Sequence, residues 1–127
     1  MIPFETPFGS VATLVCYDGF LVPHTEKEPG FTRLAPACDA RGASILAHPA
    51  ANPWPWDERW VFAAEHERQL RREQWQSEGI EASLRTPRLQ HVRHAVTAHL
   101  LGDVLDNHFE GRSQIFERTS DGEPRVI

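Results

Sequence analysis

The sequence of 127 residues contains little cysteine, and this scarcity limits the classes of protein to which it can belong. Its two cysteines are Cys16 and Cys38, and two cysteines do not build the disulfide framework of a small secreted protein. The N-terminal segment MIPFETPFG has neither the basic part nor the apolar part of a secretory signal peptide. We therefore expect a cytoplasmic protein with reduced thiols.

The chain also lacks a cluster of basic residues and a long hydrophobic run. Its formal net charge is -5, and glutamates are interspersed in its densest basic group, Arg68, Arg71 and Arg72. Because nucleic-acid phosphates are bound by clustered Lys and Arg, we expect no nucleic-acid partner. No apolar stretch approaches the roughly 20 residues that cross a bilayer, so we expect no membrane partner.

The residue pattern predicts one α/β domain over residues 1–127. Apolar or β-branched runs bounded by Gly or Pro predict strands over residues 3–8, 11–16, 42–49, 92–101 and 112–118. A short helix is expected within residues 31–41. Asp57 is a suitable N-cap for a longer helix that runs to about Ser77 and ends at Gly79. Loops or polar connectors are expected over residues 17–30, 50–57 and 80–90.

The segment GSVATLVCYDGF, residues 9–20, places Cys16 where a predicted buried strand ends and the chain must turn. Two interpretations are open. Free cysteines are among the most buried residue types, so Cys16 can be a packing residue. A cysteine at a sharp strand exit can also be a nucleophile, because the corner exposes its sulfur and directs backbone N–H groups at a developing oxyanion.

Histidine and tryptophan supply the other candidate site residues. The seven histidines have no spacing typical of zinc ligands, and C-x-x-C and H-E-x-x-H motifs are absent, so we expect no metal. We expect three of these histidines to lie on one strand-like run with side chains on different faces: His91, His94 and His99. Two roles are open for the tryptophans of the loop after the third predicted strand. Their rings either anchor the loop to the core or line a ligand pocket, and the residues are Trp54, Trp56 and Trp60.

Three segments together resemble the carbon–nitrogen hydrolase superfamily, also called the nitrilase superfamily. The first, TPFGSVATLVCYDGF, is similar to the strand that leads to the nucleophile of the family and ends in Cys-Tyr-Asp or Cys-Trp-Glu. The second, ARGASILAHPAANP, is similar to the helix end and strand that follow it. The third, AVTAHLLGDVLDNHFEGRSQIFERTSDGE, resembles the closing part of the domain. Their order and rough spacing agree over nearly the whole chain.

The resemblance implies a four-layer α-β-β-α sandwich and a thiol hydrolase of non-peptide carbon–nitrogen bonds in amides, nitriles or carbamoyl compounds. Cys16 would attack the substrate carbon and form a thioester, and the backbone N–H of Tyr17 would help to hold the oxyanion. The substrate pocket is assigned to His48, Pro49, Asn52 and Trp54. No metal or organic cofactor is expected. Cys-Tyr-Asp favours an amidase-like enzyme, with a nitrilase as the alternative.

The chain departs from the family pattern before the cysteine. The general-base Glu, the Lys and the second Glu of the family precede the nucleophile, whereas only 15 residues precede Cys16 and none of them is a lysine. The chain is therefore interpreted as the C-terminal portion of the sandwich, with a poorly activated Cys16. We expect a homo-oligomer or a complementing N-terminal half as its partner. The alternative is a catalytically inactive module that binds a partner.

Overall fold

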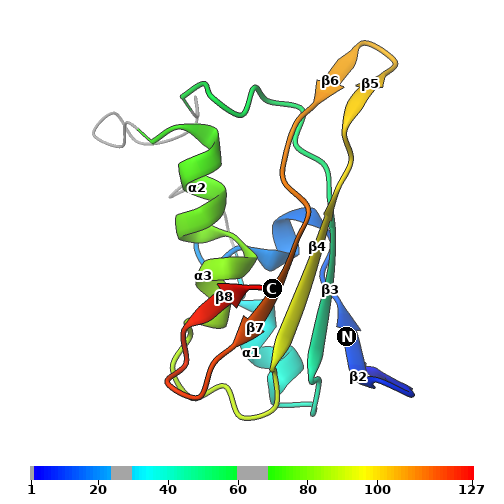
Figure 1. Cartoon of the computed structure of the whole chain (residues 1–127), viewed down its shortest axis with the longest axis vertical. Helices are drawn as coiled ribbons and strands as arrows, with labels where there is room; N and C mark the ends of the chain where they lie inside the picture. The colour runs from blue at the N-terminus through cyan, green and yellow to red at the C-terminus, as the bar shows by residue number, and fades with distance from the viewer. Residues whose placement is uncertain (1, 24–29, 60–68) are drawn as a thin grey trace.

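The protein is described by a computed structural model that covers residues 2–23, 30–59 and 69–127. A six-stranded sheet forms its centre (Figure 1). The strands are β1 (Phe4–Thr6), β2 (Gly9–Thr13), β3 (Ile45–Ala50), β4 (His94–His99), β7 (Gln114–Arg118) and β8 (Pro124–Val126). They lie in the order β1-β2-β3-β4-β7-β8. The pairs β2–β3 and β3–β4 are parallel, and the pairs nearer the edges are antiparallel.

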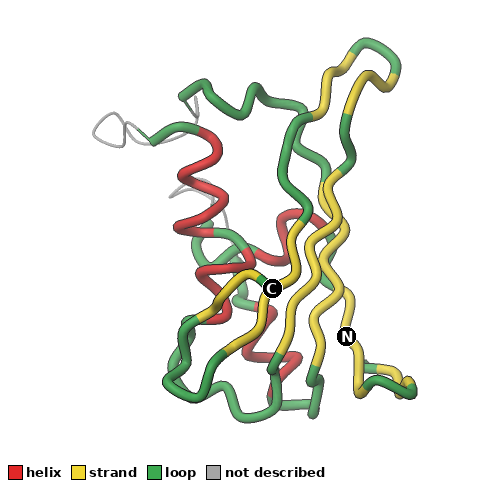
Figure 2. The backbone as a smooth tube through the Cα atoms, viewed as in Figure 1, coloured by secondary structure: helices red, strands yellow, loops and turns green. Residues whose placement is uncertain are grey.

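Helices cover one face of this sheet (Figure 2). They are η1 (Cys16–Gly19), α1 (Leu34–Asp39), α2 (Arg71–Glu78) and α3 (Ile80–Leu84), of which η1 is a single 3-10 turn. Side chains on one face of the strands form the core with residues of α1 and α3: Leu14, Leu46, Ala95, Phe116, Ala35, Cys38, Ile80 and Leu84. This alternation of buried strand residues is what the period of two along a strand requires.

The other face of the sheet is not covered by any described residue. Val96 of β4 and Ile115 of β7 are register partners on this face, and they are 37% and 45% exposed. Thr13, Pro49 and Ala98 are exposed as well. The described residues thus form two layers, one sheet and the helices on one of its faces. The predicted α/β class is confirmed, and two of the four layers of the expected sandwich are present.

A second sheet of two strands, β5 (Gly102–Val104) and β6 (Asn107–Phe109), extends as an arm beyond the main sheet (Figure 1). The turn of the arm carries Leu105, which is 95% exposed and has a positive φ of 53°. None of the helices in the described ranges is long and apolar enough to cross a membrane.

The helix expected from Asp57 to Ser77 is present, within the described residues, only from Arg71 onward. Residues 57–59 are not helical, and Arg59 pairs with Leu70 in an isolated antiparallel bridge. Residues 60–68 of that prediction lie outside the described residues. Helix α2 starts at Arg71 and ends at Glu78, and Gly79 is its C-cap, as expected for its end. Its start is set by Glu73, whose carboxylate accepts a hydrogen bond from the Leu70 N–H at 3.0 Å.

Two predicted loops contain helical turns. Residues 80–84, expected to be part of a polar connector, form α3, because Ile80, Ala82 and Leu84 are buried under the sheet. In the loop expected over residues 17–30, the first residues form η1, and Gly19 and Phe20 are buried. In both cases tertiary burial outweighs the local polar and glycine signals.

Candidate functional site

Cys16 is the first residue of η1 and lies at the sharp corner that follows β2. Its φ is 50°, in the left-handed region that residues other than glycine seldom adopt. The corner is closed by Asp18, whose N–H donates to the Val15 carbonyl at 3.0 Å and whose carboxylate accepts from the Val15 N–H at 3.0 Å. A strained turn after a strand is also the geometry of a nucleophile elbow, which presents a reactive side chain at the end of a sheet. The predicted strand exit is confirmed, although β2 itself ends at Thr13.

The Cys16 side chain faces the end of the neighbouring strand. It is partly exposed, and its Sγ donates to the Ala51 carbonyl at 3.4 Å. Ala51 directly follows β3, which runs parallel to β2 and pairs with it. The thiol therefore lies at the carboxyl edge of two parallel strands, where α/β sheets generally bind ligands.

His48 packs against this corner and is only 1% exposed. Its Nε2 lies 2.6 Å from the Cys16 carbonyl oxygen, and its Nδ1 lies 3.2 Å from the Thr97 hydroxyl. A carbonyl can only accept, so Nε2 carries the proton and Nδ1 accepts from Thr97. Burial lowers the pKa of His48, although the hydrogen bond to the Cys16 carbonyl opposes this shift. A neutral His48 in this tautomer has both ring nitrogens engaged and positions the turn.

Asn52 and Arg71 form a buried polar network behind the loop that follows β3. The Asn52 amide is fully buried, donates to the Trp54 carbonyl at 2.6 Å and accepts from Arg71 Nε at 2.8 Å. Arg71 also bonds Gln74 and lies 5.3 Å above the ring of Trp75. Burial lowers the pKa of Arg71 to about 10, while Cys16 and Glu78 oppose the shift. Arg71 is thus a buried cation close to Cys16.

The sequence does not predict a buried Arg71, because this residue lies in a run of alternating charges that is typical of a solvated helix face. Its neighbour Arg72 does lie on the surface, where it bonds Asp57. The partner of Arg71, Asn52, is remote in sequence. The one local signal is Trp75, four residues on, since a guanidinium one helical turn from an indole can pack over it.

The predicted pocket residues occupy three different places. His48 and Asn52 are buried and engaged in the hydrogen bonds above. Pro49 lies on the uncovered face of the sheet. Trp54 is half-buried in the loop after β3, where its indole N–H donates to the Arg59 carbonyl at 3.1 Å. Their assignment to a substrate pocket stays a prediction.

Aromatic rings surround the turn that carries Cys16. Phe20 packs edge-on against Trp75 with ring centroids 4.9 Å apart, and Cys16, Tyr17 and Trp56 pack against this cluster. The Tyr17 hydroxyl donates to the Val22 carbonyl at 3.5 Å. Trp56 pins its loop to the core, one of the two roles expected of the tryptophans, whereas Trp60 lies outside the described residues.

The histidines of β4 lie on different faces, as expected. His99 contacts Trp75 on the helix-covered side, with ring centroids 4.6 Å apart, and His94 is an odd number of residues away along the strand. Within residues 2–23, 30–59 and 69–127, no group of three or more His, Cys, Asp or Glu side chains is arranged to hold a metal ion.

Comparison with known proteins identifies the fold. No family model matches the sequence, and no curated protein matches it. The structure is similar to an amidase of the nitrilase superfamily from Nesterenkonia AN1, solved as a variant with one cysteine replaced by alanine, with a TM-score of 0.58 and 17% identity. It is equally similar to a carbon–nitrogen hydrolase from Helicobacter pylori G27, with a TM-score of 0.58 and 17% identity.

These likenesses cover 100% and 98% of this chain but only 37% and 38% of the two solved chains. The chain therefore has the fold of part of a nitrilase-superfamily protein, as the sequence resemblance implies. It spans less than two fifths of the length of the proteins it matches.

Proposed function

We propose that this chain supplies the cysteine-bearing part of a thiol hydrolase that acts on amide carbon–nitrogen bonds. The observation that carries the proposal is the position of Cys16, strained at φ 50° and partly exposed at the carboxyl edge of β2 and β3. It occurs in a fold shared with an amidase and a carbon–nitrogen hydrolase.

The proposed reaction has two stages. The Cys16 sulfur attacks the amide carbonyl carbon, the carbon–nitrogen bond breaks, and the amine leaves with a proton while the acyl group remains on sulfur as a thioester. Water then attacks the thioester, which releases the carboxylic acid and restores the thiol. The backbone N–H of Tyr17, next along η1, is proposed to donate to the oxyanion, and the positive charge of Arg71 favours that negative charge electrostatically.

The proposed reaction needs a general base for the Cys16 thiol, and none of the described residues offers one in hydrogen-bonding contact with Sγ. In this part of the chain the only hydrogen bond of Sγ is to the Ala51 carbonyl, and His48 has both ring nitrogens engaged. We propose that a partner supplies the base, either a second copy or a complementing half that covers the open face of the sheet. A binding module without catalysis is the second candidate, and this same lack of a base near Sγ favours it.

An activated ester tests whether Cys16 is a nucleophile without requiring a general base. p-Nitrophenyl acetate needs no proton on its leaving group, so Cys16 is expected to take its acetyl group as a thioester that intact-protein mass spectrometry detects. The adduct is expected to disappear in Cys16→Ser and to persist in Cys38→Ala, because Cys38 is only 1% exposed. An unmodified Cys16, or acetylation at Cys38 alone, would contradict the nucleophile assignment.

Turnover of unactivated substrates is expected to be absent or very slow in the isolated chain. A base contributes about 10²–10⁴-fold to such reactions, and none contacts Sγ within the described ranges. The assay is ammonia release from simple amides, carbamoyl compounds and nitriles, with Cys16→Ser as the matched control. Clear turnover that depends on Cys16 would show that the 127 residues contain their own base.

A further inference from the structure

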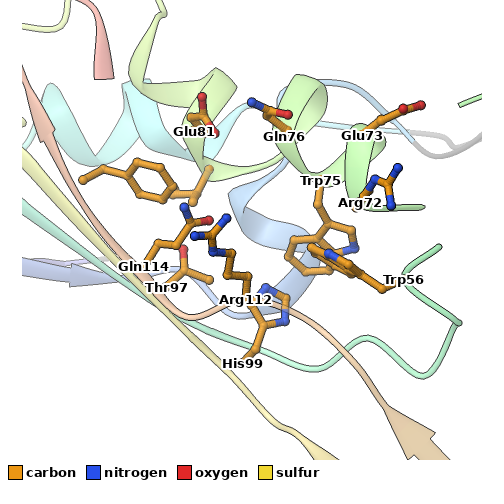
Figure 3. Close-up of a pocket in the computed structure, with 12 residues that line it drawn as sticks. Trp56, Arg72, Glu73, Trp75, Gln76, Glu81, Thr97, His99, Arg112 and Gln114 are labelled. Carbon is orange, nitrogen blue, oxygen red and sulfur yellow. The ribbon is translucent and has the colours of Figure 1, made fainter. Parts of the chain in front are cut away.

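A cavity of about 340 Å³ lies on the helix-covered side of the sheet, between α2–α3 and the strands β4 and β7 (Figure 3). Cys16 is not among its lining residues. Trp56, Trp75 and His99 form an aromatic wall, with ring centroids separated by 4.6 Å for Trp75–His99 and 6.2 Å for Trp56–Trp75. The volume is at the small end of the roughly 300–1,000 Å³ typical of ligand pockets.

Two polar atoms of the aromatic wall have no hydrogen-bond partner among residues 2–23, 30–59 and 69–127. They are the indole Nε1 of Trp75, a residue that is only 6% exposed, and Nδ1 of His99. An indole N–H can only donate, and buried donors are nearly always satisfied. Burial, with smaller effects of His48 and Arg71, lowers the pKa of His99 to about 4, so this ring is neutral at pH 7. The wall therefore offers flat apolar surface and an unused neutral donor.

Two charged side chains at the cavity have partners of opposite charge, since Arg72 pairs with Asp57 and Glu81 pairs with Arg85 at 2.8 Å. Glu73 keeps its negative charge and accepts a hydrogen bond from the Leu70 N–H. Arg112 makes no hydrogen bond or ion pair within the described part of the chain, and its side chain lines the cavity beside His99 and Gln114 (Figure 3). A ligand is thus offered one free guanidinium, which suits a carboxylate.

We propose that this cavity binds a small aromatic carboxylate that carries a second hydrogen-bonding group. The ring of the ligand lies against Trp56 and Trp75, its carboxylate pairs with Arg112, and its second group accepts from Trp75 Nε1. The site uses none of the atoms assigned to the Cys16 chemistry, so the proposal stands whether or not Cys16 is a nucleophile.

The probe is 4-hydroxybenzoate, titrated into the ¹⁵N-labelled full chain while the indole N–H resonance of Trp75 is followed by NMR. Trp75→Phe assigns this resonance among those of the four tryptophans. A saturable shift is expected. Arg112→Ala is expected to weaken binding about tenfold or more, because a hydrogen bond to a charged group is worth about 1.5–3 kcal/mol and each 1.4 kcal/mol is tenfold.

Two matched controls test the parts of the proposal. Arg125→Ala removes an exposed arginine that pairs with Glu117 outside the cavity, so it should leave the affinity unchanged. 4-Hydroxybenzamide keeps the ring and hydroxyl but has no charge, so it should bind at least about tenfold more weakly. No shift of the Trp75 resonance at millimolar 4-hydroxybenzoate, equal binding of the amide, or unchanged affinity in Arg112→Ala would each overturn the assignment.

Discussion

Gly19 illustrates how closely the turn that carries Cys16 is packed. A Cβ at this position would lie 2.5 Å from Nε2 of His48, the atom that donates to the Cys16 carbonyl. The Gly19 carbonyl also accepts a hydrogen bond from the buried Ser83 hydroxyl at 2.9 Å, and this bond restrains the backbone from moving away from His48. The φ of Gly19 is not in the left-handed region, so a glycine is needed here for the close approach of the His48 ring and not for backbone conformation.

Gly19→Ala is therefore expected to destabilise the protein by about 1–3 kcal/mol, the range for overpacking a filled site. The measurement is the free energy of unfolding from urea denaturation. In the double mutant Gly19→Ala/His48→Ala the steric conflict is gone, so the loss is expected to be smaller than the sum of the two single losses. Additive losses would show that Gly19 and His48 do not compete for space.

The sequence predicts part of this site and not the rest, for a physical reason. Cys16 is found because its strand and the turn after it have local signals, β-branched residues before it and Gly19 after it. The Asn52–Arg71 hydrogen bond joins residues 19 positions apart and exists only in the folded chain. Apart from Trp75 four residues on, no local pattern distinguishes the buried Arg71 from the solvated Arg72 beside it.

At the scale of elements, Asp39 joins the end of α1 to the segment that enters β4. Its carboxylate is 5% exposed and accepts hydrogen bonds from the backbone N–H groups of Gln90, His91 and Val92 at 2.7–3.0 Å. Burial by itself raises the pKa of Asp39, but these hydrogen bonds outweigh it and leave the pKa below its ordinary value. The ionised form is therefore the one that holds the two elements together.

Asp39→Asn is expected to lower the free energy of unfolding by about 1–3 kcal/mol near neutral pH, because the uncharged amide accepts these hydrogen bonds less well. Since the folded pKa is depressed, the stabilisation is fully present above the unfolded pKa of about 3.9 and is lost as the pH falls through the folded pKa. Urea denaturation between pH 7 and pH 3 measures both effects. The difference between wild type and Asp39→Asn should shrink toward the acid end.

The exposed Asp106, in the turn of the β5–β6 arm, is the matched control. Asp106→Asn should change the free energy of unfolding by no more than about 0.5 kcal/mol at any pH in this range. A constant difference between wild type and Asp39→Asn across the pH range would contradict the proposed role of the ionised carboxylate.

The predicted elements succeed where burial and local pattern agree. The two strands predicted from short apolar runs bounded by Gly or Pro, over residues 11–16 and 42–49, are confirmed as β2 and β3, and the structure shows that they pair in parallel. Asp57 has the residue type of an N-cap, but residues 57–59 form a turn and a bridge with Leu70. Helix α3 is short, and its apolar residues gain their burial from the sheet rather than from a long amphipathic stripe.

At the scale of the whole molecule, the open face of the sheet is the face that none of the described residues covers. Most sheets bury at least one face and tolerate water on the other when its residues are polar. Here that face carries Val96 and Ile115 side by side, together with Ala98 and Pro49. Apolar surface is stabilised by burial at about 25 cal/mol per Å², which makes the covering of this face favourable. In the function proposed above, the second copy or complementing half that covers this face would also supply the base for Cys16.

The isolated chain is accordingly expected to associate through this face, and paired charges should prevent it. In Val96→Lys/Ile115→Glu, opposite charges replace the two apolar side chains at register partners, so cross-strand pairing is kept while the apolar surface is lost. Size-exclusion chromatography with light scattering should show oligomers for wild type and a smaller mass for the double variant. Leu105→Lys, at the exposed turn of the β5–β6 arm, should leave the oligomers unchanged. A monomeric wild type with a sharp cooperative melt would mean that the chain closes its own core. Dissociation by Leu105→Lys instead would place the contact on the arm.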